Sequence, residues 1–242
     1  MTQLFPPDYA AESDLQAPAT RPLVILGFGG LGREILVLLG QLNAVGANWD
    51  VRGFYDDRTP AGPTVAGLLY LGTSADLNAT PELLAVAVAV GDSAARAALV
   101  ARLTSPRLSF PPLVHPGVEL RPTQRITLGE GCLIQPGCVL TCDIQLGRFV
   151  LLSAGCTVGH DAVLDDFCSL MPQVSVGGAT HLHAAAYLGA HATVLQGLRI
   201  GVGATLGAGA VALRDVPPHV TAVGVPARVI GNARNLSKEG SG

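Results

Sequence analysis

The stretch that decides the fold runs from residue 146 to residue 170 and reads LGRFVLLSAGCTVGHDAVLDDFCSL. An aliphatic residue recurs at every sixth position of this stretch, and the register continues unbroken on both sides. A period of six turns an α-helix by about 600°, so no single helix can gather these residues on one face. A strand rarely exceeds about ten residues, so the chain must turn a corner every six residues. The register comprises Leu128, Ile134, Leu140, Leu146, Leu152, Val158, Leu164, Leu170, Val176, Leu182, Leu188, Val194, Ile200 and Leu206.

Three six-residue segments close one coil of about 18 residues, which predicts a parallel β-helix shaped as a triangular prism of about five coils. An earlier set, Val114, Leu120 and Ile126, slips by two residues before Leu128, which predicts a bulge or small loop where the prism begins. The fourth residue after an aliphatic one is small, as a second inward position requires. This slot holds Cys132, Cys138, Cys156, Ala162, Cys168, Ala186, Ala192, Ala204 and Ala210. The cysteines are therefore interpreted as packing residues, in preference to metal ligands or disulfides.

Glycine directly follows many of the aliphatic residues. We interpret these glycines as corners that need unusual backbone angles. They are Gly129, Gly147, Gly159, Gly177, Gly189, Gly201 and Gly207.

The composition narrows the class of protein. The chain has 242 residues, 49% of them hydrophobic, which is long enough for two domains with their own cores. Charged residues make up 14%, the formal net charge is −3 and the basic residues are dispersed, so we expect no nucleic-acid partner and no binding to anionic lipid. The longest strongly apolar stretch, residues 83–90, is too short to span a bilayer, and the N-terminus is not that of a secretory leader. We expect a cytoplasmic protein, where inward free cysteines stay reduced.

Strand and helix patterns alternate in the N-terminal half. The patterns predict strands at 22–26, 51–55 and 84–90 and helices at 33–42 and 93–103. This alternation predicts a small Rossmann-like α/β domain over residues 21–108, with a parallel sheet and a crevice at the carboxyl ends of its strands. A proline-marked link at 105–112 leads to the prism, which is expected over residues 109–231. Residues 1–20 and 232–242 are expected to be a flexible leader and tail.

A glycine turn follows the first predicted strand and reads GFGGLG over residues 27–32. Such a turn lets the backbone approach a phosphate at a helix N-terminus, although it can also be a plain tight turn. Asp56 and Asp57 end the second strand, where an acid can bond a ribose or a base edge. The ligand suggested by these features is a dinucleotide or a nucleotide-sugar. About 85 residues are too few for a full two-half dinucleotide fold, which favours a smaller nucleotide-linked ligand.

Histidines are the candidate catalytic groups. His160 follows the inward Val158 by two residues, so it lies at a corner or outward, and Asp161 comes next. A neighbouring carboxylate can fix the tautomer of an imidazole and strengthen it as a general base, although a solvated role is also open. For His183, His191 and His219 we expect simple solvent exposure, and for His115 a structural role at the domain junction.

A catalytic zinc site on the prism is the competing interpretation of the histidines. It would need three converging protein ligands and an open fourth position. His160 and His181 are 21 residues apart and would not stack in coils of about 18 residues, and His181 and His183 lack an evident third partner. We therefore expect no metal.

The chain resembles the bacterial hexapeptide-repeat sugar acetyltransferases related to nucleotide-amino-sugar N-acetyltransferases and sialic-acid O-acetyltransferases. The resemblance covers residues 22 to 230, and its order of a small nucleotide-binding domain before the prism is distinctive. It rests on Leu26-Gly27-Phe28-Gly29-Gly30-Leu31-Gly32-Arg33-Glu34, Gly53-Phe54-Tyr55-Asp56-Asp57, Val88-Ala89-Val90-Gly91-Asp92, Gly159-His160-Asp161 and Val223-Gly224-Val225-Pro226-Ala227.

The resemblance implies a left-handed β-helix, a homotrimer and acetyl-CoA in the groove between adjacent prisms. It makes His160 the base and Asp161 its acidic neighbour. Ser169 stands where some members have a second histidine near the thioester, and Leu31 where many have a histidine. The cofactor contacts implied by the resemblance are Ser169, Gly178, Ala190 and Ala208, and the nucleotide-sugar contacts are Gly29, Gly30, Leu31, Asp56, Asp57 and Gly91.

The reaction expected from these features is direct transfer of an acetyl group from acetyl-CoA to the amine of a nucleotide-linked amino sugar. His160 would remove a proton, and the N–H of Gly178 is the candidate oxyanion donor. O-acetylation of a sugar hydroxyl would need the same base. A zinc hydratase on the same fold and a non-catalytic trimer that binds nucleotide-sugar remain alternatives from other classes.

Overall fold

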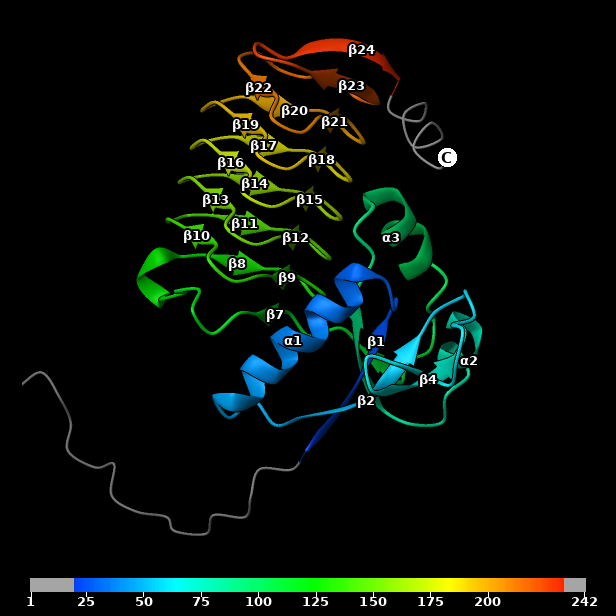
Figure 1. Ribbon diagram of the computed structural model, residues 1–242. Coiled ribbons are helices and arrows are strands. Elements are labelled where there is room, and N and C mark those ends of the chain that lie inside the picture. Colours follow the sequence, from blue (N-terminus) through cyan, green and yellow to red (C-terminus); the bar gives the residue numbers. More distant parts are fainter. Residues whose placement is uncertain (1–19, 233–242) are drawn as a thin grey trace, which may run out of the picture.

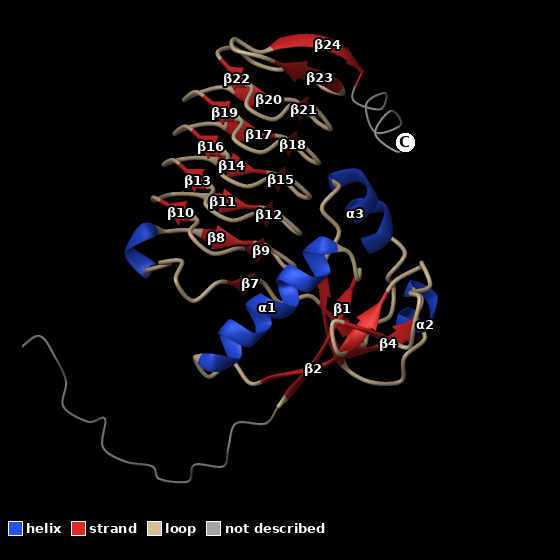
Figure 2. Ribbon diagram, in the orientation of Figure 1, coloured by secondary structure: helices blue, strands red, loops and turns tan. Residues whose placement is uncertain are grey.

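The computed structural model describes residues 20–232, and the expected leader and tail lie outside them except for residue 20 and Asn232, which ends the last strand. A small α/β domain packs against one side of a long triangular prism (Figure 1). Within residues 20–232 the helices belong to the α/β domain, apart from one 3₁₀ turn at the start of the prism (Figure 2). In this part of the chain no helix has the length and apolar character needed to cross a bilayer.

The α/β domain is built on a six-stranded sheet in the order β3-β4-β2-β1-β5-β6. Neighbouring strands run parallel except for the β3–β4 pair. From the central β1 the chain moves to β2 on one side and later to β5 on the other, which opens a crevice at their carboxyl ends. The elements are β1 (Arg21–Leu26), α1 (Gly30–Ala44), β2 (Trp49–Tyr55), β3 (Thr64–Val65), β4 (Leu68–Gly72), α2 (Ser74–Asn78), β5 (Leu84–Val88), α3 (Ser93–Val100) and β6 (Leu108–Ser109).

The predicted strands and helices of this domain are all present, with ends shifted by a few residues. The sequence patterns missed the β3–β4 hairpin and α2, because elements of two to five residues carry too little periodicity to detect. The stretch expected to be a link contains β6, which pairs with β5 at the edge of the sheet.

The prism has three faces, named here after one strand of each. The β14 face holds β8 (Thr127–Leu128), β11 (Gln145–Leu146), β14 (Val163–Leu164), β17 (His181–Leu182) and β20 (Arg199–Ile200). The β15 face holds β7 (Leu113–Val114), β9 (Leu133–Ile134), β12 (Leu151–Leu152), β15 (Ser169–Leu170), β18 (Tyr187–Leu188), β21 (Thr205–Leu206), β23 (Val220–Val223) and β24 (Arg228–Asn232). The β13 face holds β10 (Val139–Leu140), β13 (Thr157–Val158), β16 (Ser175–Val176), β19 (Thr193–Val194) and β22 (Val211–Ala212).

The six-residue register forms the core of the prism, as predicted. Leu146 pairs with Leu164 and Leu152 with Leu170, so partners on stacked coils are one coil apart in the sequence. Every member of the register is buried except Leu128 in the first coil, which is partly buried. The 3₁₀ turn η1 (Pro122–Gln124) lies between Leu120 and Ile126, a few residues before the predicted slip at Leu128. The parallel β-helix is the fold that the spacing predicts, and its left-handed sense is the one that the resemblance implies.

The inward cysteines are free and pack in the core, as expected. Burial raises the pKa of the Cys132 thiol to about 11 and that of Cys168 to about 12. Both thiols are therefore neutral packing groups at physiological pH.

The interpretation of the corner glycines is wrong. A Cβ on Gly159 would lie 2.5 Å from the nitrogen of Gly178, and a Cβ on Gly147 would lie 2.8 Å from the carbonyl carbon of Asp165. These glycines are needed because stacked coils approach closely there. The left-handed backbone falls two residues later in each segment and is often adopted by other residues, such as Asp161 at φ +57°.

The β15 face carries the α/β domain, and α3 lies alongside it (Figure 1). Arg96 of α3 is 1% exposed and donates to the carbonyl oxygens of Phe149 and Phe167 at a corner of the prism. Phe110, from the segment that joins the domains, makes an edge contact with Phe149, which stacks on Phe167. These contacts fix the crevice of the α/β domain relative to the prism.

Candidate active site

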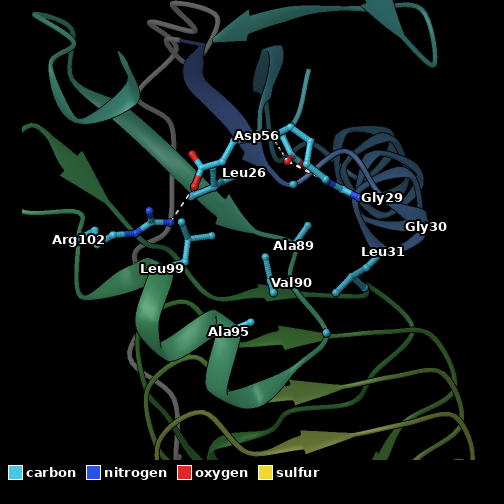
Figure 3. A pocket seen from close by; sticks show the side chains of 14 residues that line it. Leu26, Gly29, Gly30, Leu31, Asp56, Ala89, Val90, Ala95, Leu99 and Arg102 are labelled. Atoms are coloured by element: carbon cyan, nitrogen blue, oxygen red, sulfur yellow. Dashed lines mark hydrogen bonds and ion pairs between the residues drawn. The ribbon is translucent and has the colours of Figure 1, made fainter. Parts of the chain in front are cut away.

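The crevice at the carboxyl ends of β1, β2 and β5 is a cavity of about 440 Å³ (Figure 3). It brings together all six residues that the resemblance implied for the nucleotide-sugar. They are Gly29, Gly30, Leu31, Asp56, Asp57 and Gly91. Their role in binding a nucleotide-sugar remains a prediction.

The glycines of the turn divide into two kinds. A Cβ on Gly27 would meet the carbonyl oxygen of Ala89 at 2.7 Å, and one on Gly32 would meet the oxygen of Gly27 at 2.0 Å. Those two glycines are needed for packing. A Cβ on Gly30 would meet nothing within 4 Å, and the N-cap Gly29 offers no side chain to cap α1. Gly29 and Gly30 therefore leave open space beside the first turn of a 15-residue helix, where N–H groups favour an anion.

Asp56 holds the crevice together. Its side-chain oxygens accept from the Phe28 N–H at 3.0 Å, from the Arg58 backbone N–H at 2.9 Å, and from Arg58 Nε and Nη2 at 3.1 and 2.9 Å. A carboxylate has about four acceptor sites, and these four hydrogen bonds occupy them. Burial alone would raise the pKa of Asp56, but the bonds from Arg58 and Phe28 lower it overall. Asp56 is 8% exposed, so it positions the glycine turn and has little capacity left for a sugar or base.

The Asp57 carboxylate is more accessible to a ligand than the Asp56 carboxylate. Its Oδ1 accepts from the Ser74 N–H at 2.9 Å and its Oδ2 from Arg102 at 2.8 Å, while 45% of its side chain is exposed. Hydrogen bonds from Ser74, with a further contribution from Arg102, lower the pKa of Asp57 to about 2. The carboxylate is therefore ionised at neutral pH and retains lone pairs for a ligand.

Arg58 and Arg102 line the same crevice, and sequence reasoning missed both. Their side chains are 68% and 58% exposed. The Arg58 guanidinium lies 4.9 Å from the centre of the Phe28 ring. Arg58 lies beside the first turn of α1, since a Cβ on Gly29 would be 3.7 Å from its Nη2, and a guanidinium there suits a phosphate. Arg102 lies on the opposite side of the crevice (Figure 3). For Arg58 the sequence offered one signal, its position directly after Asp57. Arg102 lies beyond the end of α3 at Val100, whereas the predicted helix ran to residue 103.

His160 and Asp161 form the pair that their sequence positions suggested. The imidazole Nδ1 lies 2.8 Å from the Asp161 carboxylate, and both side chains are more than 60% exposed. The other ring nitrogen lies over the next coil, since a Cβ on Gly178 would be 2.5 Å from His160 Nε2. The structure therefore brings His160, Asp161 and Gly178 together at the corner between the β13 and β14 faces.

The other implied cofactor contacts lie elsewhere. Ala190 and Ala208 follow β18 and β21, at the corner between the β15 and β13 faces. Ser169 is fully buried beneath the α/β domain, where its hydroxyl donates to the Gly91 carbonyl at 2.8 Å and accepts from Arg96 at 2.8 Å. The expectation that Ser169 contacts the cofactor is therefore corrected, because its strand faces the domain junction and its hydroxyl is used there.

The reasoning that left His181 and His183 without a third partner is also wrong. Asp165 lies one coil before His183 and accepts from both rings, 3.0 Å from His181 Nε2 and 3.3 Å from His183 Nδ1. The separation of 18 residues between Asp165 and His183 was a usable signal, since residues one coil apart stack in a prism.

The crevice and the histidine pair of one protomer lie on different sides of the prism. The α/β domain covers the β15 face, whereas His160 lies at the corner joining the other two faces. In Figure 1 the corner between β13 and β14 is on the side away from α3.

Comparison with known proteins agrees with this architecture. The family model described as the PglD N-terminal domain matches residues 22–103. A putative acetyltransferase from Staphylococcus aureus (strain COL) is 41% identical over 58 residues, which is 24% of this chain. The matched segment spans 29% of the length of that relative.

Solved structures match over nearly the whole chain. The acetyltransferase domain of PglB from Neisseria gonorrhoeae is 29% identical, with a TM-score of 0.79 over 87% of this chain and 100% of that one. A histidine-to-alanine mutant of GDP-perosamine N-acetyltransferase from Caulobacter crescentus, in complex with CoA and GDP-perosamine, is 30% identical. Its TM-score is 0.76 over 88% of this chain and 99% of that one. The chain therefore belongs to the hexapeptide-repeat family of sugar acetyltransferases.

Proposed function

We propose that the protein transfers the acetyl group of acetyl-CoA to the amino group of a nucleotide-linked amino sugar, with His160 as general base. The observation that carries this proposal is the exposed His160–Asp161 pair, whose Nδ1 is bonded and whose Nε2 has no protein partner within residues 20–232. A proton on Nδ1, held by Asp161, leaves Nε2 with a lone pair. Such a nitrogen can accept a proton from an attacking amine.

The transfer needs orientation and a base, and no covalent enzyme intermediate. The amine nitrogen attacks the acetyl carbonyl carbon while His160 Nε2 takes the amine proton. The C–S bond then breaks, and the departing thiolate takes up the proton, which gives the amide and free CoA. Gly178 is the proposed oxyanion donor, since its N–H donates to no acceptor among the described residues and lies at the same corner as His160.

The crevice is the proposed site for the nucleotide. Arg58 and the first turn of α1 would hold the diphosphate, Arg102 adds positive charge on the opposite side of the crevice, and Asp57 keeps acceptor capacity for a ribose or base. The complexes of the Caulobacter enzyme with CoA and GDP-perosamine support a nucleotide-sugar and a CoA thioester as substrates.

We propose a homotrimer, because His160 and the crevice face different sides of one protomer. Acetyl-CoA would lie in the groove where the corner of His160 and Gly178 meets the corner of Ala190 and Ala208 of a neighbour. Each active site would then combine a crevice from one protomer with a base from another.

The test is release of free thiol from acetyl-CoA in the presence of a panel of nucleotide-linked amino sugars. We expect turnover with at least one amine, none with the counterpart in which a hydroxyl replaces that amine, and loss of about 10²–10⁴-fold in kcat for His160→Ala. His219→Asn, which changes an exposed imidazole before β23, away from the corners of His160 and of Ala190, is the matched control. Turnover of the hydroxyl sugar alone would show an O-acetyltransferase, and normal turnover by His160→Ala would remove His160 from the mechanism.

A further inference from the structure

Three side chains of types that can bind a metal ion lie together on the β14 face, apart from the His160–Asp161 pair. Asp165 follows β14, while His181 begins β17 and His183 follows it. One ligand atom from each residue lies within 4.8 Å of the others. The Asp165 carboxylate is 3.0 Å from His181 Nε2 through Oδ1 and 3.3 Å from His183 Nδ1 through Oδ2. Ligands about 2.0–2.2 Å from a shared ion lie about 3–3.5 Å from one another, and the Asp165 carboxylate lies at such a separation from each imidazole, through a different oxygen for each.

The positions of Asp165 and His183 are unusual within the prism. The residues that directly follow the β14-face strands stack in a column, one residue from each coil. Besides Asp165 and His183, this column contains Gly129, Gly147 and Gly201. At each of those three glycines an added Cβ would lie within 2.5 Å of an atom of the next coil. These positions are therefore suited to glycine. At two consecutive coils the position holds Asp165 and His183 in place of glycine.

The departure does not disturb the stacking of the coils. The Asp165 N–H donates to the Leu182 carbonyl and the His183 N–H to the Ile200 carbonyl, both at 2.9 Å. Packing therefore gives no reason for these two side chains. Within residues 20–232 the three polar groups hydrogen-bond only to one another through their side chains, and no lysine or arginine pairs with Asp165.

The cluster is accessible without being fully exposed. Its side chains are 36%, 36% and 31% exposed for Asp165, His181 and His183. Asp165 also lines a hollow of about 440 Å³, together with Asp166, Gly147 and Ala184. Three protein ligands beside a hollow leave room for a further ligand, such as water, on the ion.

We propose that Asp165, His181 and His183 bind a divalent transition-metal ion of the zinc type. Two imidazoles and one carboxylate form a donor set that suits Zn²⁺, whereas Mg²⁺ and Ca²⁺ prefer oxygen alone. The ion would join two successive coils, since Asp165 comes from one and both histidines come from the next. It plays no part in the proposed acetyl transfer, whose base lies at a different corner.

The experiment uses the full chain, freed of metal by a chelator and then dialysed against Zn²⁺ or Mg²⁺. We expect one Zn²⁺ per chain and a rise in Tm of roughly 5 °C at saturation, with no comparable effect of Mg²⁺. Co²⁺ should give the visible absorption of an ion bound by imidazoles. Asp165→Asn and His181→Asn should each weaken Zn²⁺ binding by at least about tenfold, the minimum typical even for loss of a supporting residue.

His219→Asn is the matched control, because it removes an exposed imidazole outside the cluster and should bind Zn²⁺ as the wild type does. Having two cluster variants keeps the test decisive if one of them folds poorly. The proposal is overturned if the wild type takes up no Zn²⁺, if both cluster variants bind it as tightly as His219→Asn, or if Mg²⁺ gives the larger stabilisation.

Discussion

Arg96 of α3 donates a hydrogen bond of 2.8 Å to the hydroxyl of Ser169 on β15. The same guanidinium donates to the Val90 carbonyl at 2.6 Å, on the loop that lines the crevice. Burial lowers the pKa of Arg96 to about 10, so the side chain stays charged at neutral pH. One buried cation therefore ties the nucleotide crevice to the prism, and its contacts are carbonyl and hydroxyl oxygens.

Replacing Arg96 should weaken both the junction and the crevice. Arg96→Met leaves several buried carbonyls without their donor, and we expect the free energy of unfolding to fall by about 3 kcal/mol. Urea denaturation measures this, and Arg107→Met, at an exposed arginine, is the control. Equal stability of the two variants would contradict the role assigned to Arg96.

Gly30 is expected to matter for the ligand and not for the fold. An added Cβ would meet nothing within 4 Å in the protein, so Gly30→Ala should leave Tm unchanged or slightly higher. It should weaken nucleotide-sugar binding by about tenfold or more if a phosphate approaches the backbone there. Calorimetric titration of Gly30→Ala against Gly40→Ala, an equally open position in the middle of the same helix, makes the comparison. Equal affinities would place the phosphate elsewhere.

Gly178→Ala should act on the imidazole of His160. Its methyl group would lie 2.5 Å from Nε2, so the ring must move. Because the ring is an exposed side chain, stability should change little, whereas a displacement of about 1 Å should lower kcat by about 100-fold. The measurement is kcat alongside nucleotide-sugar affinity, which should be unchanged because the crevice lies on another face. An unaltered kcat would show that the position of this ring does not limit the reaction.

Much of this molecule can be predicted from the sequence, because its regularities are local. The spacing of Leu146, Leu152 and Val158 requires a corner every six residues, and His160 beside Asp161 is a contact between neighbours. The groups that were missed depend on contacts distant in sequence: Arg102 reaches Asp57 across 45 residues, and Ser169 meets Arg96 across 73. Periodicity places a side chain on a face, but which domain covers that face is decided by tertiary packing.

Asp57 should make stability depend on pH in a defined window. Its folded pKa of about 2 lies below the ordinary value of 3.8, so its stabilising effect is complete above about pH 4 and is lost as pH falls toward 2. Because 45% of the side chain is exposed, the effect is about 1 kcal/mol. Asp57→Asn should therefore be less stable than wild type at pH 7 and equal to it near pH 2, as measured by urea midpoints. A difference that stays constant across this range would show that charge is not its cause.

The central claim is that one active site combines the crevice of one protomer with His160 of another. The most direct measurement is the activity of mixed oligomers made by co-expressing two inactive variants, His160→Ala and Arg58→Glu with Arg102→Glu. If the site is shared, some interfaces pair an intact crevice with an intact His160, and random mixing should restore about a quarter of wild-type activity. Activity no greater than the sum of the two variants alone would contradict the account.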